Sequence, residues 1–249
     1  MDEQNLKGLL SKERFGSSMP VDAPYYQSPP FYYRDARALS VAYETDADSA
    51  ASILPEGLEL PLPARATLIV VHYPSSTFGA YNEAMLGLRC IWQRQEFFYI
   101  PHIAVDSVPP LVGGREIWGY PKKFAQVQLC QRDELWLGTV ERPAGVRLVT
   151  ATIRPEQPVK PVPSAAGGGS LSLRVMPNPE ANQPPTAELI AVQGGERQTH
   201  EIWAGPATVR FDSESALDPW HALPVRRVLG GTFSRYDFSL PHGRVLHRY

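Results

Sequence analysis

The stretch that most clearly indicates the fold is TLIVVHY, at residues 67–73. It is rich in β-branched and aromatic residues and is too short for an ordinary helix, which predicts a buried strand. A second run of the same kind, FFYIPHIA, follows at residues 97–104. Working outward, similar runs separated by Pro, Gly, Asn and Asp predict further strands at residues 39–44, 124–130, 135–140, 146–153, 170–176, 188–192 and 207–211.

Helices are expected to be few and short. The chain has 25 prolines in 249 residues, about twice the usual ~5%, and proline breaks helices because it lacks a backbone donor. We predict one short helix over residues 2–13 and another over 47–54, which Asp46 caps and Pro55 ends. The sequence therefore predicts a mainly β (α+β) fold with a few short helices.

One segment resembles a linker. Residues 155–169 (PEQPVKPVPSAAGGG) are rich in Pro and then in Gly. Because the strand pattern continues unchanged on both sides, we interpret the segment as a long surface connection. We therefore expect residues 1–249 to form a single domain.

Composition excludes several classes of protein. Lys and Arg total 24 against 26 Asp and Glu, a formal net charge of −2, so no electrostatic field favours nucleic acid or an acidic membrane. No apolar run approaches the roughly 18 residues that span a bilayer. The two cysteines, Cys90 and Cys130, cannot form a disulfide framework. We expect a cytoplasmic protein with no nucleic-acid or membrane partner.

Common catalytic motifs are weak or missing. The sequence GGGS at residues 167–170 lacks the lysine and spacing of a phosphate-binding loop, and no Gly-x-Gly-x-x-Gly follows a strand. None of the six histidines forms a recognisable metal-ligand pair. No Gly-x-Ser-x-Gly elbow is present, and Cys90 and Cys130 lie in apolar runs that should raise a thiol pKa. We predict neither a metal nor an organic cofactor.

The segment that carries chemistry is GGREIWGYPKKF, at residues 113–124. Pro121 favours extended geometry in its neighbourhood, so Lys122 should begin the strand that continues through Phe124. Successive side chains of a strand point to opposite faces. Lys122 and Lys123 should therefore diverge, one toward the interior and the other toward solvent.

A buried lysine has distinctive reactivity. Loss of ammonium hydration lowers a lysine pKa from about 10.4 by as much as several units. The resulting neutral amine attacks ketones and forms a Schiff base. The alternative interpretation is a surface Lys-Lys pair that merely ends a strand, which is the commoner situation for lysine.

Here the chain resembles the acetoacetate decarboxylase superfamily over nearly its whole length. The resemblance rests on GRE at residues 114–116 followed by PKK at 121–123, where the first lysine of the family signature corresponds to Lys122. Supporting matches are YETD at 43–46, GAYNE at 79–83, LGT at 137–139, LVTATI at 148–153, VMPN at 175–178 and HEIWAGP at 200–206.

The resemblance implies an antiparallel closed or cone-like β-barrel or sandwich that encloses a pocket. It implies that Lys122 forms the Schiff base, that Glu83 handles a proton or positions the imine, and that Lys123 contributes at most electrostatically. A weakly basic, activated lysine is a known property of that family. It also implies a homo-oligomer, and a keto acid as the small-molecule partner with no cofactor. Apolar wall candidates are Phe31, Tyr33, Phe98, Ile100, Trp118 and Tyr120.

Two departures from the family pattern affect substrate placement. An ungapped alignment puts Ala36 where family members carry an arginine, and strand parity favours Arg34 over Arg37 as its substitute. A second family glutamate falls at Leu68, inside the 67–73 strand. Carboxylate placement decides which bond breaks next to the imine carbon, so these changes bear on the type of reaction.

The resemblance and these departures from it give three candidate functions. The first is cofactor-independent decarboxylation of acetoacetate or a related β-keto acid, a lyase activity. The second is an aldolase-dehydratase or cyclase that uses the same lysine on pyruvate-like 2-keto acids. The third is a small-molecule binding protein that keeps the pocket without catalysis.

Overall fold

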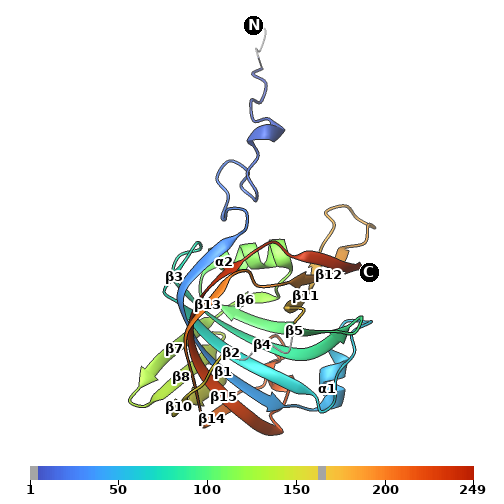
Figure 1. Ribbon diagram of the computed structural model, residues 1–249. Coiled ribbons are helices and arrows are strands. Elements are labelled where there is room, and N and C mark those ends of the chain that lie inside the picture. Colours follow the sequence, from blue (N-terminus) through green and yellow to red (C-terminus); the bar gives the residue numbers. More distant parts are fainter. Residues whose placement is uncertain (1–4, 162–166) are drawn as a thin grey trace.

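The computed structural model describes residues 5–161 and 167–249. Two β-sheets dominate this part of the chain (Figure 1). The larger runs in the order β10-β13-β15-β1-β2-β4-β5-β11-β12-β16, with β3 paired to β1 and β6 paired to β5. Its strands are β1 (Phe31–Glu44), β2 (Arg65–Tyr73), β3 (Ser75–Ser76), β4 (Tyr81–Trp92), β5 (Gln95–Val105), β6 (Lys122–Phe124), β10 (Gln157–Pro158), β11 (Ser170–Met176), β12 (Thr186–Val192), β13 (Arg197–Gly205), β15 (Arg227–Leu240) and β16 (Arg244–Arg248).

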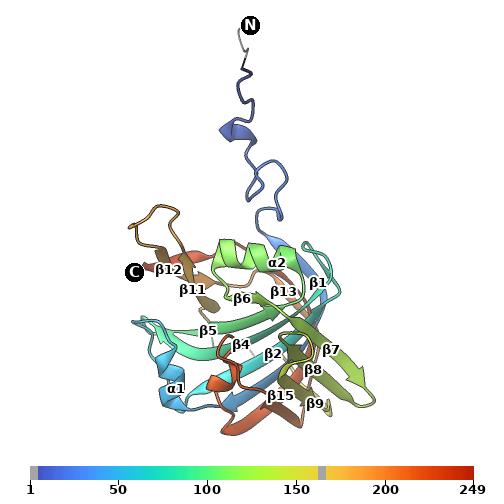
Figure 2. The same ribbon diagram turned by 180° about the vertical axis from the view of Figure 1, so that it is seen from behind.

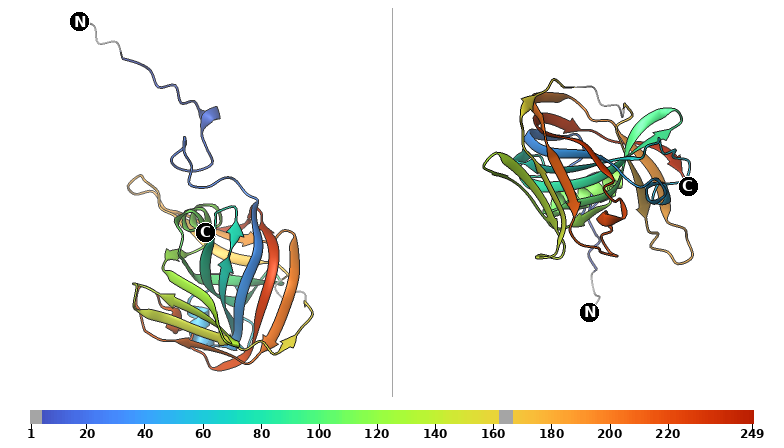
Figure 3. Two further views of the ribbon diagram at one scale, coloured as in Figure 1. Left: turned by 90° about the vertical axis from the view of Figure 1, so that its left-hand side faces the viewer. Right: turned by 90° about the horizontal axis from the view of Figure 1, so that it is seen from below.

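The smaller sheet has the order β14-β9-β8-β7. It comprises β7 (Gln126–Arg132), β8 (Leu135–Glu141), β9 (Arg147–Ile153) and β14 (Ala207–Phe211). It packs against the lower half of the larger sheet, as the side view in Figure 3 shows. The core between the sheets includes Leu39, Val41, Leu68, Val70 and Leu86 from the larger sheet and Val127, Val140, Val149, Ile153 and Val209 from the smaller.

A second apolar cluster fills the other half of the larger sheet. Here α2 (Val108–Gly113) and the π-helical turn η2 (Gly114–Trp118) lie across the sheet next to β6 (Figure 2). The cluster is strongly aromatic and includes Phe31, Tyr33, Tyr73, Tyr81, Trp118, Tyr120 and Tyr236. The side chains of the long central strands thus serve two separate cores, one of which surrounds Lys122.

The mainly β prediction is confirmed, with two corrections to the architecture. The larger sheet is mixed and not purely antiparallel, because β5 pairs in parallel with both β6 and β11. The expected closed barrel is not confirmed: within the described residues the end strands β10 and β16 pair with β13 and β12, not with each other. The larger sheet curves without closing (Figure 3).

The two predicted helices have different outcomes. The helix after Asp46 is present as α1 (Ala47–Ser52), and the Asp46 carboxylate accepts a hydrogen bond from the backbone N–H of Ser49 at 3.0 Å. The helix predicted over residues 2–13 is wrong for its described part, where only the 3₁₀ turn η1 (Lys12–Arg14) forms. Residues 5–14 are exposed, so no apolar face is buried to stabilise a helix. None of the described helices is long and apolar enough to cross a membrane.

Several strands were missed or misjudged. The predicted 124–130 strand is divided at Ala125, whose N–H donates to the carbonyl of Val105, so β6 and β7 enter different sheets. Strands β4, β13, β15 and β16 were not predicted, because charged residues and glycines interrupt their apolar pattern. Pairing with neighbours on both sides places β4 and β15 inside the larger sheet regardless of that pattern. The 155–169 segment contains β10, and residues 162–166 lie outside the described residues.

Candidate active site

Strand β6 places its two lysines on opposite faces, as predicted. Lys122 follows Pro121 as the first residue of β6, and its side chain is 6% exposed. The side chain of Lys123 is 45% exposed. The period of two therefore directs Lys122 into the aromatic cluster and Lys123 toward solvent.

The segment before β6 shapes the space around Lys122. A Cβ atom at Gly114 would lie 2.6 Å from Cε and 3.2 Å from Nζ of Lys122, so any larger residue there would displace the lysine side chain. Gly119 ends the π-helical turn with φ of 71°, a conformation that favours glycine. Arg115 donates from Nη1 to the carbonyl of Lys122 at 3.1 Å. The GRE motif thus supports the lysine through backbone contacts.

Glu83 of β4 is the direct partner of Lys122. Nζ of Lys122 lies 2.5 Å from Oε2 of Glu83, and the two side chains are 6% and 7% exposed. Glu83 faces Val105 on β5, and Lys122 faces Ile103 two residues away on the same strand. Both charged groups therefore project from one face of the sheet, on either side of β5.

Tyrosines surround this pair. Nζ of Lys122 lies 5.9 Å from the ring centroid of Tyr81 and 6.0 Å from that of Tyr120. The Tyr81 hydroxyl donates to the hydroxyl of Tyr33 at 3.3 Å, and the Tyr73 ring lies 4.8 Å from both Tyr33 and Tyr81. The surroundings of the pair are aromatic, but they also offer phenolic hydrogen-bonding groups.

These phenols stay protonated. Burial, with a smaller contribution from the Glu83 carboxylate, raises the pKa of Tyr33, Tyr73, Tyr81 and Tyr120 well above the ordinary value. A neutral phenol donates a hydrogen bond. The site therefore presents donors suited to an oxygen that gains negative charge.

Lys123 has a different partner on the other face of β6. Its Nζ lies 3.1 Å from Oδ1 of Asp218 and contacts the carbonyl of Leu217. The other Asp218 oxygen accepts from Nε of Arg142 at 3.0 Å. Asp218 thus holds the charge of Lys123 away from the Lys122 pair.

The predicted wall residues differ in how close they come to the amine. Tyr120 contacts it most directly and shares a hydrogen bond with Ser170 at 2.9 Å between hydroxyls. Trp118 is buried in the same cluster, but its indole N–H donates to the carbonyl of Pro241 at 3.0 Å. Phe31 stacks on Phe78 with centroids 4.1 Å apart. Trp118 and Phe31 therefore support the cluster, while Tyr120 lies beside the lysine.

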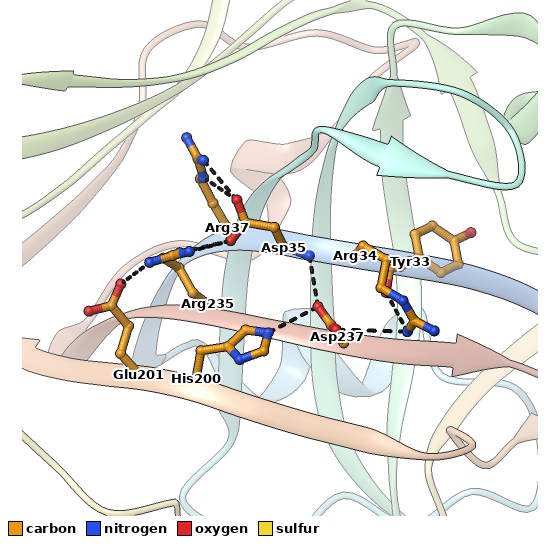
Figure 4. Close-up of polar contacts among 8 residues, drawn as sticks. All are labelled: Tyr33, Arg34, Asp35, Arg37, His200, Glu201, Arg235 and Asp237. Carbon is orange, nitrogen blue, oxygen red and sulfur yellow. Dashed lines mark hydrogen bonds and ion pairs between the residues drawn. The ribbon is translucent and has the colours of Figure 1, made fainter.

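The parity argument for Arg34 is wrong. A β-bulge interrupts the β1–β15 pairing between Tyr33 and Ala36, and Asp35 within it has φ of 53°. The extra residue reverses the alternation, so Tyr33 and Ala36 are both buried while Arg34 is 60% exposed. Figure 4 shows Arg34 directed toward Asp237 and Arg37 toward Asp35, within one polar network.

The expectation for Leu68 is also wrong. Leu68 is fully buried in the core between the two sheets, not in the aromatic cluster around Lys122. Residues of β2 that belong to the aromatic cluster are Val71 and Tyr73. An ungapped alignment counts residues but does not determine which face of a strand each one occupies.

Some site residues were missed by sequence reasoning. Tyr81 precedes Glu83 by two positions on one strand, so parity within the quoted GAYNE match could have found it. Tyr73 and Tyr236 gave no local signal. They reach the cluster only because β2 and β15 both pair with β1.

Other reactive groups lie apart from this pair. Burial raises the pKa of the Cys90 thiol to about 12, as its apolar run predicted. In the part of the chain that the structure describes, no group of three or more His, Cys, Asp or Glu residues could hold a metal ion. The described chemistry therefore centres on one amine, one carboxylate and several phenols.

The fold and the site together define a β-protein built around a buried amine paired with a buried carboxylate. Residues 18–249 match the family model described as acetoacetate decarboxylase. The chain therefore belongs to the acetoacetate decarboxylase family.

Comparison with individual relatives supports this family assignment. The chain is similar to acetoacetate decarboxylase 2 of Mesorhizobium japonicum, with 30% identity over 236 residues that cover 93% of this chain and 89% of the relative. It is 26% identical over 248 residues to acetoacetate decarboxylase of Clostridium botulinum, with 98% of each chain covered.

Solved structures show the same fold. Acetoacetate decarboxylase from Legionella pneumophila superposes with a TM-score of 0.86 at 24% identity, covering 99% of each chain. The enduracididine biosynthesis enzyme MppR, in complex with the condensation product of pyruvate and imidazole 4-carboxaldehyde, gives a TM-score of 0.80 at 22% identity, covering 95% of this chain and 98% of that one.

Proposed function

We propose that this protein is a cofactor-independent lyase that decarboxylates acetoacetate or a related β-keto acid through a Schiff base on Lys122. The observation that carries the proposal is the buried Lys122–Glu83 pair, with Nζ and Oε2 2.5 Å apart. Membership of the acetoacetate decarboxylase family supports the same chemistry.

The first step is formation of the imine. Glu83, at 2.5 Å from the Lys122 nitrogen, accepts a proton from it, which frees the amine to act as the nucleophile. The amine attacks the ketone carbon and forms a carbinolamine. Glu83 returns its proton to the departing hydroxyl, so water leaves and a protonated imine remains.

The second step is loss of carbon dioxide. The electron pair of the breaking C–C bond moves to the iminium nitrogen, which gives an enamine and CO₂. Protonation of the enamine carbon and hydrolysis of the new imine release the ketone and regenerate the amine. The rings of Tyr81 and Tyr120 lie beside the nitrogen on which this chemistry occurs.

The proposal is tested by incubation with acetoacetate and with a panel of other β-keto acids. We expect carbon dioxide release from at least one of them, and sodium borohydride added during turnover should convert Lys122 to a secondary amine detected by peptide mass spectrometry. Absence of both signals with every member of the panel would rule the proposal out.

A second candidate reaction is aldol condensation with dehydration, or cyclisation, of pyruvate-like 2-keto acids. Ala36 in place of the arginine that the family resemblance leads one to expect favours this alternative. The similar fold of MppR, solved in complex with a pyruvate condensation product, points the same way. Incubation with pyruvate and an aldehyde should then give a condensed product by mass spectrometry, with no carbon dioxide from β-keto acids.

The remaining alternative is a binding protein without catalysis. It predicts saturable binding of a keto acid, no turnover and no borohydride-dependent adduct on Lys122. Trapping therefore separates it from both enzymatic proposals in one measurement.

A further inference from the structure

A keto acid that reaches Lys122 brings a negative charge into the aromatic cluster. The carboxylate there needs a cation or several hydrogen-bond donors, because burial of an unpaired charge is costly. Before the imine forms, Lys122 does not supply this cation, since the proposed nucleophile is a neutral amine. The residue that binds the carboxylate therefore has to be found elsewhere on the same face of the larger sheet.

The arginines near Ala36 on β1 do not meet this requirement. Arg34 lies 3.8 Å from Asp237, and Arg37 lies 2.7 Å from Asp35. Arg235 of β15 pairs with Asp35 at 2.7 Å and with Glu201 at 3.1 Å. Figure 4 shows these side chains joined to Asp35, Asp237 and Glu201 in one polar network. Each of these three arginines already forms an ion pair with a carboxylate of the protein.

Arg197 of β13 lies on the inner face instead. Its cross-strand partner on β15 is Phe238, and directly paired residues of antiparallel strands share a face. Phe238 stacks on Tyr33 with centroids 4.2 Å apart, and Tyr33 bonds to Tyr81 beside Lys122. The register therefore aims Arg197 at the same aromatic cluster that contains the amine.

The guanidinium of Arg197 rests on Tyr236. Its Cζ lies 3.6 Å from the ring centroid, which is a close cation–π contact. Tyr236 is in turn the direct cross-strand partner of Ala36. The cation thus adjoins the position where Ala36 presents only a methyl group.

The availability of the guanidinium also distinguishes Arg197 from Arg34, Arg37 and Arg235. Among residues 5–161 and 167–249, no carboxylate lies within 4.0 Å of it. Stacking against a ring uses the flat side of the group and leaves the N–H donors at its edge directed outward. Such an edge matches the two oxygens of a carboxylate.

We propose that Arg197, held on the ring of Tyr236, binds the carboxylate of the keto acid and so determines the preference for anionic substrates. The proposal rests on the proposed function, because it takes Lys122 as the group that binds the ketone. It assigns to β13 the role that sequence parity had given to Arg34.

The test compares two ketones that differ in charge, acetoacetate and its methyl ester. For each, the concentration that gives half-maximal borohydride trapping on Lys122 is measured by mass spectrometry. We expect Arg197→Met to raise this concentration roughly tenfold or more for acetoacetate and less than twofold for the ester. Arg197→Lys, which keeps the charge, should give an intermediate value.

Two further variants serve as controls. Arg210→Met removes an equal charge from an exposed arginine on β14 that pairs with Asp212, and it should leave both concentrations unchanged. Arg34→Met should also leave both trapping concentrations unchanged. The ester reports on folding, since a misfolded variant would lose trapping with both ketones.

The outcomes separate the two proposals. If wild-type protein forms no adduct with either ketone, the Schiff-base function fails and the role of Arg197 falls with it. If the wild type forms adducts and Arg197→Met changes the two concentrations equally, only the role of Arg197 is overturned. A selective loss of acetoacetate binding in Arg34→Met, and not in Arg197→Met, would likewise overturn it.

Discussion

Lys122 and Lys123 are adjacent residues of the same type, each paired with a carboxylate, yet they occupy opposite environments. The Lys122–Glu83 pair is buried on both sides, with exposed fractions of 6% and 7%. In the Lys123–Asp218 pair the lysine is 45% exposed and the carboxylate is shared with Arg142. A shift of one residue along the strand therefore converts a surface ion pair into a buried one.

The difference teaches why only one lysine is a candidate nucleophile. The Lys123 side chain is partly exposed and shares Asp218 with Arg142, so it forms a surface ion pair that solvent screens. Among the residues that the structure describes, the charged partner of the Lys122 amine is Glu83, and phenols and aliphatic side chains lie around the pair. A proton that leaves Lys122 has a near acceptor, and the neutral pair that results suits a dry site.

The largest expected effect comes from removing the buried amine. Lys122→Met should reduce carbon dioxide release to the uncatalysed background, because no other described lysine lies in the aromatic cluster. It should also lower the free energy of unfolding by about 3 kcal/mol, since Glu83 loses its partner. Adding Glu83→Gln should recover most of this stability but no activity, which urea denaturation and a carbon dioxide assay would measure.

Glu83→Gln alone tests the carboxylate. It keeps the shape of the side chain but removes the proton acceptor, so kcat should fall about 10²- to 10³-fold. Steady-state kinetics would show it. A variant with unaltered kcat would mean that Glu83 only balances the charge of Lys122.

Gly114→Ala tests the space around the amine. The added Cβ would lie 2.6 Å from Cε of Lys122, so the side chain must move by a few tenths of an ångström to about 1 Å. Displacement of this size costs about 10- to 100-fold in rate. Wild-type activity with an intact fold by circular dichroism would contradict the packing described around Lys122.

We expect His102 of β5 to dominate the pH dependence of the free energy of unfolding. Burial, with the nearby charge of Lys123, lowers the pKa of His102 to about 4. The unfolded chain binds this proton below about pH 6.5 and the folded protein only near pH 4, so stability should fall as pH drops through that window. The loss amounts to roughly 2 to 3 kcal/mol.

Denaturant unfolding of wild type and His102→Gln between pH 4 and pH 8 measures this contribution. The variant should show a shallower decline below pH 6.5 and a similar plateau above it. Identical profiles for the two proteins would exclude His102 as the source.

Lys123→Ala should have the smallest effect. Because Asp218 keeps Arg142 as a partner, the free energy of unfolding should change by about 1 kcal/mol or less. The value of kcat should change by less than about threefold. A large rise in the pH at which activity appears would instead show that the charge of Lys123 controls the amine of Lys122.

Sequence reasoning succeeded where the deciding information was local. Pro121 and the period of two predicted the opposite faces of Lys122 and Lys123, and Asp46 predicted the start of α1. It failed at Arg34 because the bulge at Asp35 depends on a distant strand: the Asp35 N–H donates to Oδ1 of Asp237 at 2.8 Å. The single domain, the homo-oligomer and the cytoplasmic location stay predictions.

The amino-acid sequence alone determined that the chain is mainly β, that it resembles acetoacetate decarboxylases, and that Lys122 and Lys123 point to opposite faces, because alternation and proline act over a few residues. Only the tertiary structure decided which phenols gather around Lys122 and that Arg197 lies against the ring of Tyr236. Those groups come from β4, β2, β15 and β13, and their meeting depends on strand order, register and one bulge, which are set by pairing between segments far apart in the chain.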